Sequence, residues 1–164
     1  MALTPAGETF RSRVSNPLFF FGWSLVKLPS ALFCGVGVAE LTESGCRTTV
    51  PYGWRSQNPF RSTYFAAQAM AAELSTGALV LLATTDAGVP ISTLIVGLEA
   101  TFGKKADATT TFFCDQGADV FVAVREAVAT GEPRNVVLQT VGRLPDGTEV
   151  SRFRFTWSVK KKGG

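Results

Sequence analysis

The stretch STYFAAQAMAAELST, residues 62–76, has the composition of a helix that is enclosed by other parts of the protein. It is rich in strong helix formers and contains neither glycine nor proline. Five of its residues are alanine, and Glu73 is the only formally charged residue between Arg61 and Asp86. A surface helix carries several charges on its outer face. We therefore expect a helix that is packed on all sides, with a single carboxylate near its middle.

The ends of this helix carry local signals. Ser62 or Thr63 supplies a hydroxyl group that can cap the first turn. Gly77 favours the end of the helix. The apolar run ALVLLATTD that follows, residues 78–86, is expected to be a strand.

Apolar runs on both sides of the helix indicate further strands. In the last of them Phe153, Phe155 and Trp157 alternate with polar residues, so one face is expected to be buried and the other exposed. The sequence Pro145-Asp146-Gly147 between the last two runs is typical of a hairpin turn. The expected strands are 36–41, 48–52, 78–86, 91–106, 109–116, 135–144 and 149–160.

Two more helices complete the order of elements. One begins with Ser15 or Asn16 as N-cap and Pro17 as first helical residue, and ends near Pro29. The other covers residues 118–130. This order predicts a single α+β domain over residues 1–164, with its core at about 14–160 and one curved, mostly antiparallel sheet.

Composition excludes several classes of function. The chain has 164 residues, a formal net charge of +3 and only 18% charged residues, which does not fit a specialist in nucleic-acid binding. It has no histidine, so Ser-His-Asp triads, Cys-His dyads and His-based metal sites are excluded. Any chemistry must therefore use carboxylates, amides, hydroxyls, thiols or backbone N–H groups.

The three cysteines do not indicate a reactive or metal-binding site. Cys34, Cys46 and Cys114 are widely spaced and contain no CxxC pair. They are expected to be reduced, buried and structural, and no metal site is expected.

One apolar stretch resembles a membrane segment in composition. Residues 16–38, NPLFFFGWSLVKLPSALFCGVGV, are interrupted by Lys27 and Pro29 after about ten residues, short of the ~20 needed to span a bilayer. No membrane insertion is expected, and a cytoplasmic protein is the preferred interpretation.

An antiparallel sheet around an alanine-rich helix is typical of the hotdog fold, and residues 58–77 resemble the signature of hotdog thioesterases. In that signature an Asn, a turn and a His-Gly-Gly step lead into the central helix, and an acidic residue follows nine positions after the His. The chain is similar, over about residues 14–160, to a hotdog branch that is catalogued as a domain of unknown function and described as thioesterase-like. The aligned positions are Asn58 for the Asn, Tyr64, Phe65 and Ala66 for the His-Gly-Gly step, and Glu73 for the acid.

The resemblance implies catalytic roles for four of these residues. The Phe65 N–H at the helix N-terminus would bind the thioester carbonyl oxygen as it gains negative charge. Glu73 would act on water as a general base, or as a nucleophile, with a pKa raised by burial. Asn58 would orient water or the thioester, and the Tyr64 hydroxyl would replace the family's His as a donor.

Each catalytic assignment has a plainer alternative. Glu73 could be paired across a dimer with an arginine such as Arg55 or Arg61. Asn58 could be an ordinary turn residue before a proline. Tyr64 and Phe65 could be packing aromatics at a helix start.

A nucleotide-binding role is a further hypothesis for the loop before the helix. Trp54 and Arg55 could hold the nucleotide of coenzyme A by stacking and phosphate pairing, or could be packing residues. A set of basic residues is expected to be solvated, and a few of them could meet the phosphates of coenzyme A. The set is Lys104, Lys105, Arg152, Arg154 and Lys160 to Lys162.

The sequence thus predicts a cytoplasmic acyl-CoA thioesterase that acts as a homodimer or dimer of dimers. Edge-to-edge pairing of the sheets would protect an exposed edge strand. Acyl-CoA or a similar thioester is the expected substrate, with no cofactor, no metal and no nucleic-acid partner. The alternative is a hotdog protein that binds acyl thioesters or lipid-like ligands without catalysis, and a third possibility is a purely structural dimer.

Overall fold

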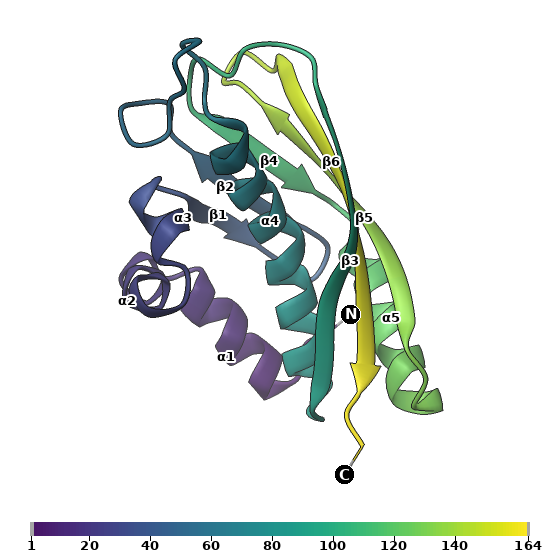
Figure 1. The fold of residues 1–164 in the computed structure, drawn as a ribbon. Helices are drawn as coiled ribbons and strands as arrows, with labels where there is room; N and C mark the ends of the chain where they lie inside the picture. Colours follow the sequence, from purple (N-terminus) through teal and green to yellow (C-terminus); the bar gives the residue numbers. More distant parts are fainter. Residues whose placement is uncertain (1, 164) are drawn as a thin grey trace.

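The computed structural model describes residues 2–163, which form a six-stranded antiparallel sheet wrapped around one long helix (Figure 1). The strands are β1 (Gly37–Leu41), β2 (Cys46–Val50), β3 (Ile91–Phe102), β4 (Thr110–Cys114), β5 (Arg134–Arg143) and β6 (Glu149–Lys161), and the helices are α1 (Pro5–Val14), α2 (Pro17–Lys27), α3 (Pro29–Phe33), α4 (Phe65–Asp86) and α5 (Gly117–Thr130). The order across the sheet is β1-β2-β4-β5-β6-β3, and all pairs are antiparallel. This is the α+β architecture that the sequence predicts.

Helix α4 continues through Gly77 to Asp86, so the prediction of a strand over 78–86 is wrong. Gly77 lies inside the helix, where its missing side chain leaves room for two neighbours. A Cβ atom there would lie 2.8 Å from Glu73 Oε1 and 3.4 Å from Trp157 Cζ2. The glycine therefore gives the Glu73 carboxylate its present position, at the cost in helix propensity that glycine carries.

The second half of α4 shows why periodicity failed there. Residues 77–80, Leu82 and Ala83 are all buried, because the sheet and the other helices cover the helix on nearly every side. A helix that is apolar all round has no period that distinguishes it from a buried strand. α4 is also long and apolar enough to cross a bilayer, but most of it is buried in this fold, as is usual for a core helix.

Hydrogen bonds that involve side chains fix α4 against the sheet. Each buried polar side chain of α4 has a partner, so none of them is left unsatisfied in the core. These bonds set the position of the helix along the sheet as well as its rotation. They join Thr48 Oγ1 to the Ala71 carbonyl (2.6 Å), Ser75 Oγ to Thr140 Oγ1 (2.8 Å), Ser151 Oγ to Gln68 Oε1 (2.8 Å) and Trp157 Nε1 to Thr76 Oγ1 (3.0 Å).

Helix α2 confirms the predicted start and end. Asn16 is the N-cap, and its Oδ1 accepts hydrogen bonds from the N–H groups of Leu18 (3.0 Å) and Phe19 (3.1 Å). Pro17 is the first helical residue, and the helix ends at Lys27.

Helix α1 has no counterpart among the predicted elements. Its N-cap, Thr4, accepts from the Gly7 N–H. The Thr4 N–H and hydroxyl both donate to Asp86 Oδ1, at 2.6 and 2.8 Å. The first helix is thereby joined to the last residue of α4, and α1, α2 and α3 lie on the side of α4 away from α5 (Figure 1).

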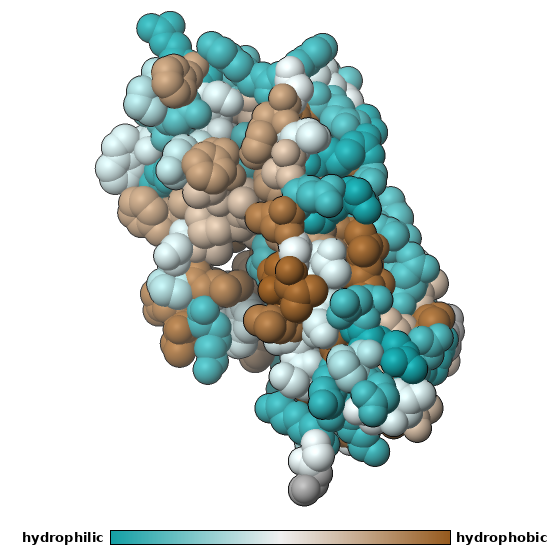
Figure 2. All heavy atoms as spheres, turned by 45° about the vertical axis from the view of Figure 1, so that its right-hand side comes forward, coloured by the Kyte–Doolittle hydropathy of each residue, from teal (hydrophilic) through white to brown (hydrophobic). Residues whose placement is uncertain are grey.

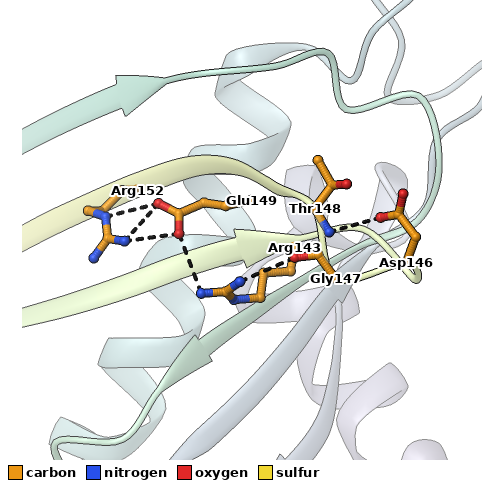
Figure 3. Close-up of polar contacts among 6 residues, drawn as sticks. All are labelled: Arg143, Asp146, Gly147, Thr148, Glu149 and Arg152. Atoms are coloured by element: carbon orange, nitrogen blue, oxygen red, sulfur yellow. Dashed lines mark hydrogen bonds and ion pairs between the residues drawn. The ribbon is translucent and has the colours of Figure 1, made fainter.

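The β5–β6 hairpin turns where the sequence predicts it. The Asp146 carboxylate accepts a hydrogen bond of 2.9 Å from the Thr148 N–H, and this bond lowers the pKa of Asp146 (Figure 3). Gly147 has a φ of 86°, in the left-handed region that favours glycine. At the base of the turn, Glu149 pairs with Arg152 (2.8 Å) and Arg143 (3.4 Å) (Figure 3).

The cysteines are unpaired, and two of the three are fully buried as predicted. Burial raises the pKa of Cys46 to about 12 and that of Cys114 to about 11, so both thiols stay protonated at neutral pH. Cys34 is half-buried rather than buried, and desolvation also raises its pKa.

Strand β3 leaves one edge of the sheet open. It pairs with β6 along its whole length, and no strand within residues 2–163 pairs with its other side. Four large apolar side chains on it are about half exposed or more, and Figure 2 shows apolar side chains gathered in a patch on this face of the molecule. They are Leu94, Val96, Leu98 and Phe102. A long edge strand with apolar side chains is a site for pairing with another chain.

Replacing Gly147 tests the hairpin turn. Gly147→Ala should lower the free energy of unfolding by about 1 kcal/mol, because a Cβ atom is strained at positive φ although the surrounding space is open. Urea denaturation measures this loss. Gly103→Ala is the matched control, since that glycine also has open space but lacks a positive φ. Equal losses of stability in both variants would contradict the strain that we assign to the positive φ of residue 147.

Candidate active site

Glu73 lies in the middle of α4 with its carboxylate in a largely apolar cavity. The cavity has a volume of about 220 Å³ and is lined by Trp23, Leu28 and Trp157 among others. The carboxylate rests against Gly77, one turn further along the helix. The side chain is half-buried rather than exposed to bulk water.

Within residues 2–163, the Glu73 carboxylate has neither a hydrogen bond nor an ion pair. This sets it apart from Gln68, Ser75 and Thr76, the buried polar side chains of the same helix, which all have partners. Burial without a compensating partner raises the pKa of Glu73 above its ordinary value of 4.5. A carboxylate with a raised pKa is a stronger base than an ordinary glutamate side chain.

The arginines considered as partners for Glu73 lie elsewhere in the chain. Arg55 lies beside Gly35, where its Nη2 would be 3.5 Å from an added Cβ atom. Arg61 is exposed on the loop before α4 and has a φ of 57°. Neither pairs with Glu73 inside one chain, and pairing across a dimer stays a prediction.

The N-terminus of α4 is uncapped. Tyr64 is the N-cap residue, but no side chain accepts a hydrogen bond from the first turn. In the part of the chain that the structure describes, no atom accepts a hydrogen bond from the Phe65 N–H. An open helix N-terminus combines free N–H donors with the positive end of the helix dipole, which favours an oxyanion.

The hydroxyl groups predicted to cap α4 are used in another way. Ser62 Oγ accepts from the Ala106 N–H (2.9 Å), and Thr63 donates its hydroxyl to the Ala106 carbonyl (2.9 Å). They hold the segment after β3 against the start of the helix. The capping prediction is therefore wrong, and its failure leaves the helix N-terminus open.

Asn58, Tyr64 and Phe65 share a cavity of about 630 Å³ at this end of α4. The Tyr64 and Phe65 rings meet edge to face at 4.9 Å, and both side chains are about half exposed. Lys104 and Lys105 line the same cavity. The three predicted residues are thus brought together, next to two cations.

Asn58 has the local role of a turn residue. Its Oδ1 accepts from the N–H groups of Phe60 (2.9 Å) and Ser62 (3.2 Å). The side-chain oxygen is therefore occupied, and only the NH₂ group remains to meet a ligand.

The two halves of the predicted site are separate within one chain. Phe65 and Glu73 are eight residues apart on α4, a distance of ~12 Å along the helix axis. They line different cavities. A single chain does not bring the backbone donor and the acid to one point.

The loop residues Trp54 and Arg55 lie beside α3. The Trp54 ring packs edge to face on Phe33 at 6.0 Å and is 80% exposed. The Arg55 carbonyl accepts from the Cys34 thiol. Their predicted contact with a nucleotide stays a prediction.

Two residues were missed by the sequence reasoning. Gly77 gives the Glu73 carboxylate its space, and Trp23 from α2 forms a wall of the same cavity. A glutamate followed four residues later by a glycine in an uncharged run was the available signal. Among residues 2–163 no group of three or more His, Cys, Asp or Glu side chains could hold a metal ion.

Comparisons with known proteins agree with the architecture. A family model described as a domain of unknown function (DUF4442) matches residues 23–159. No curated protein matches the sequence.

Solved structures share the fold at low sequence identity. A protein of unknown function and probable thioesterase from Pseudomonas aeruginosa is 16% identical, with a TM-score of 0.75 over 94% of this chain and 95% of that one. A protein of unknown function from Chlorobaculum tepidum is 12% identical, with a TM-score of 0.75 over 98% of both chains. A thioesterase from Haemophilus influenzae is 15% identical, with a TM-score of 0.63 over 84% of this chain and 87% of that one. The hotdog fold predicted for the chain is therefore confirmed.

The pKa of Glu73 predicts a pH dependence of stability. Because that pKa is raised in the folded state, the folded protein keeps a proton that the unfolded chain releases above about pH 4.5. The free energy of unfolding should therefore fall as pH rises from 4.5 through the raised pKa. Glu73→Gln removes the titrating carboxyl group. As pH rises across that window, the variant should therefore gain stability relative to the unmodified protein, as measured by urea denaturation. A stability difference that does not change with pH would contradict the burial of an unpaired carboxylate.

Proposed function

We propose that this chain, which belongs to the DUF4442 family, hydrolyses acyl thioesters, with coenzyme A esters as the expected substrates. The observation that supports this best is Glu73, an unpaired carboxylate in an apolar cavity of the central helix. An unpaired carboxylate in such surroundings is costly for folding. A role in the reaction would explain why the chain carries it. Its fold is shared with proteins described as thioesterases.

Glu73 would act as a general base. The carboxylate takes a proton from water as the water oxygen bonds to the thioester carbon. The carbonyl oxygen becomes an oxyanion, which the Phe65 N–H and the open helix N-terminus stabilise. Collapse of this intermediate breaks the carbon–sulfur bond, and the thiolate receives the proton from Glu73.

The reaction needs two copies of the chain. Pairing of two β3 edges by a two-fold axis would make the two α4 helices antiparallel. The N-terminus of one α4 would then lie toward the middle of the other, so that Phe65 of one copy could approach Glu73 of its partner. This arrangement removes the ~12 Å separation that a single helix imposes.

The two lysines beside Phe65 are suited to bind coenzyme A. Lys104 and Lys105 line the cavity at the helix N-terminus, and coenzyme A carries several phosphates. Lysine binds phosphate as a mobile point charge.

A second candidate function is binding without catalysis. Asn58 uses its oxygen in its own turn, and Tyr64 and Phe65 stand where the resembled family has His and Gly. These features favour a protein that keeps an acyl-binding site but has lost the chemistry.

Substitution of Glu73 separates the two functions. Glu73→Gln should lower kcat for acyl-CoA hydrolysis by about 10²-fold or more, because it removes the general base, while binding of the acyl-CoA is retained. Thiol release measures hydrolysis and calorimetry measures binding.

Glu126→Gln is the matched control, since Glu126 lies on α5 and pairs with Arg134 on the surface. It should leave kcat unchanged. Binding with no hydrolysis by the unmodified protein, over a panel of chain lengths, would contradict the enzyme and favour the binder.

Mixing two inactive variants tests whether the site is shared. Phe65→Pro removes the N–H donor yet keeps the helix, because proline is favoured at the first helical position. If each site joins Glu73 of one copy to Phe65 of the other, a mixture of Glu73→Gln and Phe65→Pro chains, refolded together, contains hybrid dimers with one intact site. Random pairing should restore about a quarter of the unmodified activity.

Phe65→Leu is the control, because it keeps the N–H and should retain activity. Absence of recovery in verified hybrid dimers would contradict a shared site. A monomer of 17.5 kDa that is fully active would contradict it too.

A further inference from the structure

A third cavity lies between α1 and α2, outside the two cavities of the site proposed for hydrolysis. Its volume is about 550 Å³, within the range of ~300–1,000 Å³ that is usual for small-molecule sites. The walls are largely apolar and aromatic. They include Phe10, Phe19, Phe20 and Trp23.

One cation lines this apolar cavity. Arg13, in the last turn of α1, holds its guanidinium 5.6 Å from the centre of the Phe19 ring. In the described part of the chain it has no carboxylate partner. Arg11 on the same helix differs, because it pairs with Glu8 at 2.8 Å. Arg13 is exposed. The cavity therefore presents apolar walls beside a solvated positive charge that no carboxylate within residues 2–163 neutralises.

We propose that this cavity binds a long-chain carboxylate, the anion of a fatty acid. The hydrocarbon chain of the fatty acid would lie against the aromatic walls. Its carboxylate would accept two hydrogen bonds from the Arg13 guanidinium, whose fork geometry suits a carboxylate. A ligand without a charge would make no ion pair with Arg13, and a small anion would leave the apolar walls in water.

The cavity also lies next to the Glu73 cavity. Trp23 lines both, so the two cavities meet at its side chain. A fatty acid is the product that acyl-thioester hydrolysis would release, but binding here does not depend on that reaction. The two inferences can therefore fail independently.

Titration with dodecanoate, below the concentration at which it forms micelles, tests the proposal. Calorimetry should show saturable binding that is about tenfold or more tighter than for dodecanol, because a charged hydrogen bond is lost with the alcohol. Decanoate should bind more weakly by roughly threefold to fourfold per methylene removed. Arg13→Met should abolish the preference for the acid over the alcohol.

Arg11→Met is the matched control and should bind dodecanoate like the unmodified protein. Ala6→Phe provides a second variant, since Ala6 lines the cavity and a larger side chain there should block binding without removing a charge. Both variants should leave binding unchanged at the Glu73 cavity, measured with an acyl-CoA.

Several results would overturn the proposal. They are absence of saturable binding of dodecanoate, equal weakening by Arg11→Met and Arg13→Met, and undiminished binding by Ala6→Phe. A membrane is the competing source of the same chemistry. Sedimentation with vesicles of phosphatidylcholine and phosphatidylglycerol, without binding of monomeric dodecanoate, would assign the surface to lipid headgroups and contradict the proposal.

Discussion

The structure depends on the burial of α4 inside the curve of the sheet. A helix surrounded in this way satisfies its backbone internally, and its polar side chains need partners from the strands. Gln68, Ser75 and Thr76 have such partners, which lock the helix to β5 and β6. Glu73 has none in the described chain, and Gly77 gives its carboxylate room. The helix is thus a rigid support that holds one unpaired carboxylate in apolar surroundings.

The same helix explains why a single chain keeps the two halves of the candidate site apart. Its N-terminus supplies an N–H donor at Phe65 because no side chain caps it. The rise of the helix then places Glu73 ~12 Å away. A rigid helix cannot bend to bring the two together, whereas the two-fold axis that we propose at β3 would reverse the partner helix. The apolar side chains of β3 that are exposed in one chain would become covered by this pairing.

Much of the fold could be predicted from the sequence because it follows local signals. The alternation around Phe153 and Trp157 predicted a strand with one buried face, and Asn16 with Pro17 predicted the start of α2. The second half of α4 could not be predicted in this way, because an apolar run that is buried on all sides has the same pattern in either structure. Gly77 was misinterpreted as a stop because its packing role depends on Trp157, which is distant in sequence.

The candidate site shows the same division. Glu73 could be singled out because it is the only charge in a long uncharged stretch. The separation from Phe65 into another cavity and the use of the Ser62 hydroxyl by Ala106 depend on contacts between distant segments. No local pattern reports such contacts, and so the open helix N-terminus appears only in the folded chain.

The most direct test of the account is a crystal structure of the protein with a non-hydrolysable acyl-CoA analogue. We predict a two-fold dimer in which the carbonyl oxygen of the analogue lies within hydrogen-bond distance of the Phe65 N–H of one copy. The Glu73 carboxylate of the other copy should face the carbonyl carbon. A complex in which Glu73 is ion-paired with an arginine across the interface, or in which the carbonyl group lies away from both residues, would contradict the account.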